Sequence, residues 1–143
     1  MRFKGIYTPI ITPFSSNGEI DWDVYAEVID WQIENGVAGV IVGGSTGEFY
    51  ALSKEERIQQ FKFAAERINN RVEFMAGVND IRVDECLDIS RAAVDAGAKS
   101  LLVAAPPYSF GHVGTVQPFS AIRSSQSLVS VSSSIFELPR GMY

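Results

Sequence analysis

The sequence has only one cysteine and one histidine in 143 residues, Cys86 and His112. A single cysteine excludes an internal disulfide framework and fits a reducing compartment. The single histidine lies in the low-complexity residues 111–143, so neither a catalytic triad built on histidine nor a histidine-rich metal site is expected. We therefore expect no metal centre, and we predict that the chain uses no cofactor.

Long apolar runs and an excess of positive charge are also missing. No run reaches the roughly 18 apolar residues of a membrane-spanning helix, and Met1–Lys4 leads into a strand-like segment rather than a signal peptide. The formal net charge of −5 argues against nucleic acid and anionic membranes as partners. These absences predict a cytoplasmic protein without indicating what it does.

What the sequence does contain, from residue 5 to residue 107, is an alternation of short apolar runs and longer amphipathic ones. This alternation predicts right-handed βαβ units and a parallel sheet. Successive units resemble one another, which favours a (β/α) barrel over a doubly wound sheet. The predicted strands are residues 5–12, 37–42, 72–78 and 100–105, and the predicted helices are residues 21–35, 53–68 and 83–96.

Local signals mark the ends of the predicted helices. Asp21 is a candidate N-cap, and Ser53 with Glu56 has the capping-box pattern, in which each side chain binds a backbone amide of the first turn. Gly36 and Gly97 follow the first and third helices, at the position where glycine commonly ends a helix.

Residues 111–143 differ in character from the rest of the chain. They hold only three charged side chains, and residues 120–134 contain eight serines. Uncharged low-complexity sequence is poor material for packing against a parallel sheet. We therefore divide the chain into a barrel segment, residues 1–110, and a Ser-rich tail, residues 111–143. Our hypothesis is that an interruption of the gene near codon 110 makes the tail an out-of-frame translation.

The barrel segment is too short for a closed barrel. A complete (β/α)8 barrel needs about 250 residues, so about four βα units amount to the first half of one. Such a half leaves open sheet edges that must be paired or covered.

The loop predicted to follow the second strand, Gly43–Glu48, reads GGSTGE. Functional groups of a parallel barrel lie on loops after the carboxyl ends of its strands. The glycines let the backbone turn sharply and expose its N–H groups, and Ser45 and Thr46 add hydroxyl donors, so the turn suits a carboxylate or another small anion. A hydroxyl here could also relay a proton. The alternative is a tight strand-to-helix connection in which Glu48 satisfies the loop amides.

The same loop is neither of two common nucleotide-binding motifs. It lacks the Gly-Lys-Ser/Thr ending of a phosphate-binding P-loop, and its glycines do not have the G-x-G-x-x-G spacing of a dinucleotide fingerprint. Nucleotide binding is therefore not expected.

The run GGSTGE after an apolar strand resembles the signature of the dihydrodipicolinate synthase and N-acetylneuraminate lyase family. Four further segments, GIYTPIITPF, LSKEER, AGV and AGAKSLLVAAPPY, fall where that family's corresponding pieces fall. The resemblance covers about residues 3–110. It implies a (β/α)8 barrel that acts on pyruvate or a related 2-oxo acid through a lysine Schiff base, and a homo-oligomer, either a dimer or a tetramer.

The resemblance also implies roles for residues of the loop. Ser45 resembles the hydroxyl of the family's proton relay, which makes it a catalytic as well as a substrate-binding candidate. Thr46, with its own amide and that of Ser45, resembles the cradle for the substrate carboxylate. Gly44, Gly47 and Glu48 would shape the turn that presents these groups.

Tyr108 resembles the tyrosine that reaches across a tight dimer interface into the neighbouring active site, and it is the second catalytic candidate. The family often has Thr-Pro-Tyr-Tyr where this chain has Ala105-Pro106-Pro107-Tyr108, so a proline replaces the first tyrosine. From the residues alone, the favoured interpretation of Tyr108 is an ordinary half-buried aromatic at a strand end.

A Schiff-base aldolase needs a lysine amine that is buried among apolar groups or lies beside another cation. The lysines of this chain, Lys4, Lys54, Lys62 and Lys99, are each expected on the solvated surface. In the family the reactive lysine comes from the sixth strand. The fifth carries a Tyr-Asn-x-Pro-x-Arg segment, of which residues 135–141 keep only a proline and an arginine. We therefore expect this chain to be inactive alone.

Three functions remain open at this point. The chain is a truncated member of the pyruvate-dependent lyase and synthase family, a non-catalytic half-barrel that docks onto another subunit, or a small-carboxylate-binding module.

Further residues are expected to be structural. Cys86 is expected to be a small core residue, and Trp22 and Trp31 are expected to pack against the core. An acidic cluster around the third predicted helix is expected to be a capped and solvated face; it comprises Asp80, Asp84, Glu85 and Asp88.

Overall fold

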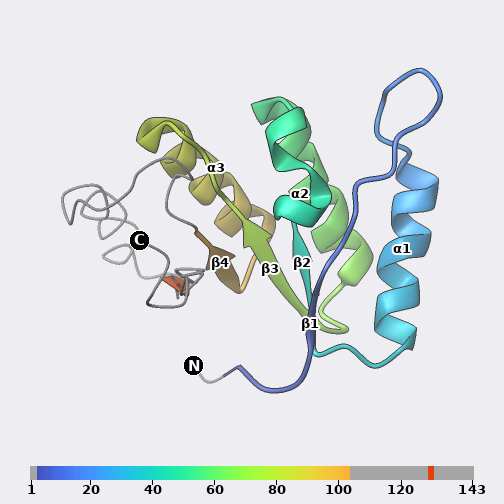
Figure 1. Ribbon diagram of the computed structural model, residues 1–143. Coiled ribbons are helices and arrows are strands. Elements are labelled where there is room, and N and C mark those ends of the chain that lie inside the picture. The colour runs from blue at the N-terminus through green and yellow to red at the C-terminus, as the bar shows by residue number, and fades with distance from the viewer. Residues whose placement is uncertain (1–2, 104–128, 131–143) are drawn as a thin grey trace, which may run out of the picture.

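The computed structural model describes residues 3–103 and 129–130 of the chain. Strands alternate with helices, and each pairing between neighbouring strands of the sheet is parallel (Figure 1). The strand order is β1-β2-β3-β4-β5. The elements are β1 Tyr7–Pro9, α1 Trp22–Glu34, β2 Gly39–Val42, the short 3-10 turns η1 Ser45–Gly47 and η2 Phe49–Ala51, α2 Lys54–Ile68, β3 Glu73–Gly77, α3 Val83–Ala96, β4 Ser100–Leu102 and β5 Val129–Ser130.

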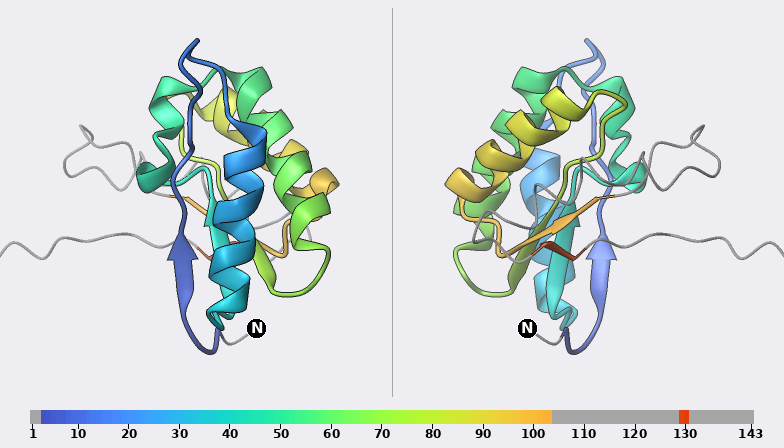
Figure 2. Two further views of the ribbon diagram at one scale, coloured as in Figure 1. Left: turned by 90° about the vertical axis from the view of Figure 1, so that its right-hand side faces the viewer. Right: turned by 90° about the vertical axis from the view of Figure 1, so that its left-hand side faces the viewer.

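Helices α1, α2 and α3 lie side by side along the sheet (Figure 2). Right-handed crossovers that always lead to the next strand place their helices on the same face of the sheet. Helix α2 accordingly contacts both α1 and α3. This layering, with strands on one side and helices on the other, is the arrangement that the alternation of the sequence predicts.

The hydrophobic core lies between these helices and the sheet. Three of the four residues of β2 are buried, which is why a β-branched apolar run forms this strand. The largest fully buried side chains include Tyr25 and Ile29 of α1, Phe61 and Ile68 of α2, Ile89 of α3, and Val40, Val42 and Leu101 of the strands.

The predicted helix ends are confirmed. The Asp21 carboxylate accepts a hydrogen bond of 3.1 Å from the amide of Val24. At the start of α2, the Ser53 hydroxyl accepts from the amide of Glu56 at 3.2 Å, and the Glu56 carboxylate accepts from the amide of Ser53 at 2.7 Å. Helix α3 ends at Ala96 and is capped by Gly97, whose φ of 107° lies in the left-handed region that favours glycine.

The strands are shorter than predicted. The first was predicted over residues 5–12, but β1 ends at Pro9, which has no N–H to donate to a neighbouring strand. One further bond, from the amide of Ile10 to the carbonyl of Ile41 at 3.1 Å, continues the contact with β2. The ends of strands depend on which neighbour they pair with, and hydropathy alone does not carry that information.

The two tryptophans of α1 have different environments. Trp22 packs against the core, and its ring lies 4.9 Å from that of Phe63, centroid to centroid. Trp31 is 60 % exposed, so the prediction that it packs against the core is wrong for this residue. The helix places Trp31 on its outer side, away from the sheet that buries Tyr25 and Ile29.

Ion pairs join the helices at their exposed surfaces. Asp30 of α1 accepts from Arg67 of α2 and, at 2.6 Å, from Arg71 just after α2. Burial opposes ionisation of Asp30, but the hydrogen bonds from the two arginines outweigh it and lower the pKa of its carboxyl. Among the described residues, no helix is both long and apolar enough to cross a membrane.

Candidate functional site

The predicted loop lies at the edge of the sheet where the strands end. After β2 the chain forms the 3-10 turn Ser45–Gly47, closed by hydrogen bonds from the amide of Gly47 to the carbonyl of Gly44 at 3.0 Å and from the amide of Glu48 to the carbonyl of Ser45 at 3.1 Å. Ser45 and Thr46 are both exposed. The turn therefore presents the two hydroxyl-bearing residues to solvent at the functional end of a parallel sheet.

Close contact between two strand ends sets the path of this loop. Gly43 has a φ of 71°, in the left-handed region, and its backbone lies directly against Gly77 at the end of β3. A Cβ at Gly77 would lie 2.7 Å from the carbonyl carbon of Gly43 and 2.8 Å from the amide nitrogen of Gly44. A residue with a side chain cannot occupy position 77 without moving the backbone of the loop.

The predicted turn-shaping residues have distinct environments. Gly44 begins the turn in an extended conformation, and a Cβ there would meet its nearest neighbour only at 3.9 Å. Gly47 is buried, and a Cβ there would lie 3.0 Å from the carbonyl oxygen of Ile10. Glu48 is exposed and has a left-handed backbone with a φ of 54°.

A buried polar chain reaches the turn from the interior. Gln60 of α2 donates from Nε2 to the Thr12 hydroxyl at 2.8 Å, and that hydroxyl donates to the carbonyl of Gly47 at 2.7 Å. Gln60 is fully buried and Thr12 is 8 % exposed. Segments that follow β1 and β2 are thus tied to helix α2 through side chains that the sequence analysis did not identify.

Arg57 is a second buried polar residue beside the loop. Its guanidinium donates to the carbonyl of Gly77 at 3.2 Å, pairs with Asp80 at 3.4 Å and lies 5.2 Å from the centroid of the Phe49 ring. Burial lowers the pKa of this guanidinium, while Asp80 opposes that shift. Arg57 therefore joins the first turn of α2 to the end of β3 and to the loop that precedes α3.

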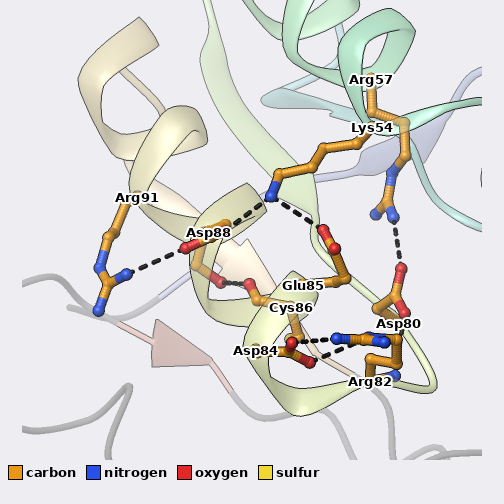
Figure 3. Close-up of polar contacts among 10 residues, drawn as sticks. Lys54, Arg57, Asp80, Arg82, Asp84, Glu85, Cys86, Asp88 and Arg91 are labelled. Carbon is orange, nitrogen blue, oxygen red and sulfur yellow. Dashed lines mark hydrogen bonds and ion pairs between the residues drawn. The ribbon is translucent and has the colours of Figure 1, made fainter.

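A cleft of about 480 Å³ opens between the start of α2 and the start of α3. Its rim carries ion pairs of Lys54 with Asp88 at 2.7 Å and with Glu85 at 2.9 Å (Figure 3). Hydrogen bonds from Lys54 to Asp88 and Glu85 raise the pKa of its ammonium. The acidic cluster is exposed or half-buried, as predicted, and it is paired with cations of both helices; the remaining pairs are Arg82 with Asp84 and Arg91 with Asp88.

No lysine lies in the loop Gly43–Glu48. Lys4, Lys62 and Lys99 are exposed, and Lys54 is half-buried with its two carboxylate partners. A Schiff-base nucleophile requires the opposite environment, one that lowers the pKa of the amine. The prediction that the four lysines lie on the surface is confirmed for Lys4, Lys62 and Lys99, while Lys54 is partly covered.

Cys86 is a core residue, as predicted. It is fully buried, and its thiol donates to the carbonyl of Val78 at 3.0 Å. Burial raises the pKa of this thiol to about 11.

Tyr108 and the Ser-rich tail lie outside the described residues apart from Val129–Ser130, so their predicted roles stay predictions. Within the described part of the chain, no group of three or more His, Cys, Asp or Glu side chains is arranged to hold a metal ion.

Sequence reasoning found the exposed turn and missed its buried supports. Gln60 and Arg57 fall at helical spacing with Phe61 and Ala64, on the face of α2 that packs against the sheet. Their sequence positions could have identified them, because a polar residue among apolar ones on a buried helix face must find a hydrogen-bonding partner in the interior.

The fold and the site together define a class of protein. A parallel sheet whose strands alternate with helices on one face is the repeating unit of a (β/α) barrel. The sequence profile of the Dihydrodipicolinate synthetase family matches residues 2–134, and the chain belongs to this family. The matched range extends past residue 110, where the sequence analysis places the end of the resemblance.

Individual relatives agree with this assignment. The chain is 36 % identical over 129 residues to a 4-hydroxy-tetrahydrodipicolinate synthase of Nitratidesulfovibrio vulgaris, covering 90 % of this chain and 44 % of that protein. The solved 4-hydroxy-tetrahydrodipicolinate synthase of Methylacidiphilum fumariolicum SolV superposes with a TM-score of 0.84 at 34 % identity, over 90 % of this chain and 43 % of that one. YagE, a prophage protein of E. coli solved in complex with pyruvate, has a TM-score of 0.84 at 32 % identity, over 89 % and 43 % of the two chains.

The chain thus spans less than half the length of these relatives. The predicted fold, the first half of a (β/α)8 barrel, is confirmed by its match to these barrels.

Proposed function

We propose that this chain supplies the carboxylate-binding part of a pyruvate-type 2-oxo acid site, with Ser45 and Thr46 as the cradle. The observation that carries the proposal is the exposure of Ser45 and Thr46 in the turn at the carboxyl end of β2, in a chain whose relative YagE was solved with pyruvate. The family chemistry implied by the resemblance is aldol addition or cleavage through a lysine Schiff base.

The geometry of the turn supports this role. Its own hydrogen bonds use the amides of Gly47 and Glu48. Within the described part of the chain, no backbone carbonyl accepts a hydrogen bond from the amide of Ser45 or Thr46, and both side chains are exposed. Two amides and two hydroxyls on consecutive residues therefore form a set of donors that suits a carboxylate.

The covalent step is assigned to a part that this chain lacks. None of its four lysines lies at the turn, and Lys54 is held by Asp88 and Glu85. We propose that the chain alone binds a 2-oxo acid reversibly, without forming a Schiff base, and that Ser45 acts as a proton relay only when a complete site is assembled. Tyr108 as a second relay residue, the homo-oligomer and the cytoplasmic location remain part of this proposal.

Titration with pyruvate tests the cradle directly. In ¹⁵N–¹H spectra of the chain, the amides of Ser45 and Thr46 are expected to shift saturably with pyruvate and not with acetone, which has the ketone but no carboxylate. Thr46→Val and Ser45→Ala are each expected to weaken binding about tenfold, since each removes a hydrogen bond to a charged group. Ser16→Ala, at an exposed serine outside the loop, is the matched control. Pyruvate shifts that spare residues 45 and 46, or no shifts, would contradict the proposal.

A second candidate function is that of a half-barrel that docks onto another subunit. The observation that favours it is the exposure of large apolar side chains at the β1 side of the molecule: Ile6 is 71 % exposed, Ile11 is 53 % exposed and Trp31 is 60 % exposed. Strand β1 stands at the end of the strand order, so its outer edge has no partner strand within the described residues. Unpaired edges of this kind favour association.

A further inference from the structure

A chain of buried hydrogen bonds links the interior of helix α2 to the candidate cradle. Gln60 lies on the buried face of α2 and forms a hydrogen bond with Thr12, which follows β1. Thr12 in turn forms a hydrogen bond with Gly47, the last residue of the turn Ser45–Gly47. Three segments far apart in sequence thus meet through two hydrogen bonds, both buried.

The direction of these bonds is fixed by chemistry. The Thr12 hydroxyl has one proton, and the carbonyl of Gly47 can only accept, so the hydroxyl donates to Gly47 at 2.7 Å. The hydroxyl oxygen then accepts from Gln60 Nε2 at 2.8 Å, and the amide NH₂ can only donate. Each bond polarises the next, so the bond from Gln60 strengthens the bond from the Thr12 hydroxyl to the carbonyl of Gly47.

The carbonyl of Gly47 belongs to the turn that presents Ser45 and Thr46. Gly47 has no room for a side chain, because a Cβ there would lie 3.0 Å from the carbonyl oxygen of Ile10 and 3.3 Å from the Thr12 hydroxyl. An anchored carbonyl at the third residue of a three-residue turn restricts the dihedral angles of the two residues before it.

We propose that Gln60 and Thr12 are positioning residues that fix the Ser45–Gly47 turn, so that helix α2 sets how tightly the cradle holds a carboxylate. The inference rests on the proposed function for its ligand, but not for its effect on the turn. Neither residue touches the ligand; both act through the carbonyl of Gly47.

The unpaired oxygen of Gln60 allows its effect on the turn to be separated from its effect on the stability of the fold. Its Oε1 is buried without a hydrogen-bonding partner within the described part of the chain. Burial raises the pKa of the Tyr25 hydroxyl in α1, and an interaction with the Gln60 side chain opposes that rise. An apolar residue of similar size at position 60 removes both this interaction and the unpaired amide oxygen, so it should change the free energy of unfolding little. Such a residue would, however, remove the hydrogen bond to Thr12, and with it the link from α2 to the turn.

The test compares Gln60→Leu, Thr12→Val and Thr12→Ser with the unaltered chain. Ser90→Ala is the matched control, because Ser90 is also a buried polar residue, but its hydroxyl donates to the carbonyl of Cys86 in α3 at 2.6 Å. The first measurement, made without ligand, is amide hydrogen exchange at Gly47 and Glu48, whose amides close the turn.

Gln60→Leu and Thr12→Val are expected to speed exchange at these two amides about tenfold, which corresponds to the loss of one hydrogen bond. Exchange in α3 should stay unchanged, and Gln60→Leu should change the urea midpoint of unfolding little. Thr12→Ser keeps the hydroxyl and should restore slow exchange, and Ser90→Ala should leave the turn unaffected. If Thr12→Val does not fold, the exchange rates of Gly47 and Glu48 in Gln60→Leu are sufficient to test the inference.

Unchanged exchange at Gly47 and Glu48 in the folded Gln60→Leu variant would overturn the inference. A second measurement, the pyruvate titration, separates it from the proposed function. With a binding-competent parent chain, Gln60→Leu should weaken pyruvate binding about tenfold, and equal affinity would overturn the claim that α2 sets the strength of the cradle. A parent chain that does not bind pyruvate would contradict the proposed function, while the exchange data would still decide whether the turn is anchored from α2.

Discussion

Gly43 and Gly77 bring two neighbouring strand ends closer than any other residue type would allow. The left-handed backbone of Gly43 turns the chain toward the cradle, and the missing side chain of Gly77 makes room for that turn. The conformation of the site therefore depends on a residue of β3 that lies outside the motif itself.

We expect Gly77→Ala to destabilise the chain by about 2 kcal/mol, because the new Cβ would collide with the backbone of Gly43 and force the strands apart. Gly44→Ala, where the Cβ has ordinary contacts and the backbone is extended, should change the free energy of unfolding by less than about 1 kcal/mol. Urea unfolding of the two variants measures both values. Equal effects of the two substitutions would show that the close approach does not constrain the fold.

At this scale the sequence predicted the exposed donors of the turn and not the buried residues that support them. Ser45 and Thr46 stood out because they lie in a glycine-rich turn directly after an apolar strand, where a parallel barrel carries its functional groups. Gln60 and Thr12 did not, because a hydrogen bond between residues 48 positions apart depends on how α2 packs against the end of β1. The hydropathy pattern and motifs of the sequence around each residue contain no information on that packing.

Among the elements, α2 is the one that connects the others. It contacts α1 and α3, carries Gln60 and Arg57 on its buried face, and begins with the capping box of Ser53 and Glu56. Hydrogen bonds from Ser53 lower the pKa of the Glu56 carboxyl. The start of this helix therefore fixes the position of the residues that support the candidate site.

We expect Ser53→Ala to reduce the free energy of unfolding by about 1 kcal/mol, the usual contribution of an N-cap side chain. The contribution of Glu56 should depend on pH. Its carboxyl has a lower pKa in the folded chain than in the unfolded one, so its stabilisation is fully present above the unfolded value of about 4.3 and is lost as the pH falls through the folded value.

Chemical unfolding at pH 7 and near pH 3 measures this contribution. The difference in stability between the parent chain and Glu56→Gln should be largest at pH 7 and should shrink toward pH 3. Glu66→Gln, at an exposed position later in the same helix, provides the comparison. A stability difference for Glu56→Gln that stays constant over this range would argue against an ionised capping box.

The order and type of the elements followed from the sequence, whereas their exact lengths did not. Caps and periodic apolar faces identified α1, α2 and α3 nearly to the residue. The strands were predicted too long, because hydrophobic residues continue beyond the point where hydrogen bonds to a neighbour stop, as in residues 5–12 around β1.

At the scale of the whole molecule, β1 stands at the end of the strand order and has one neighbouring strand among the described residues, whereas each strand of a closed barrel has two. The exposed Trp31 lies on α1, which flanks that side of the sheet (Figure 1). We expect the chain to self-associate over micromolar concentrations in sedimentation equilibrium. Trp31→Gln should weaken this association, whereas Val94→Gln on α3 should not. A chain that stays monomeric at all concentrations, or a Trp31→Gln variant that associates equally well, would contradict the docking function.

The central claim is that this chain contains the carboxylate cradle of its family and not the amine that holds the substrate covalently. Borohydride reduction in the presence of pyruvate, followed by intact-protein mass measurement, tests it most directly, with a full-length relative as the positive control. We expect an adduct on the relative and none on this chain. A single stable adduct on this chain would mean that one of its lysines, Lys4, Lys54, Lys62 or Lys99, is an activated nucleophile, which contradicts this claim.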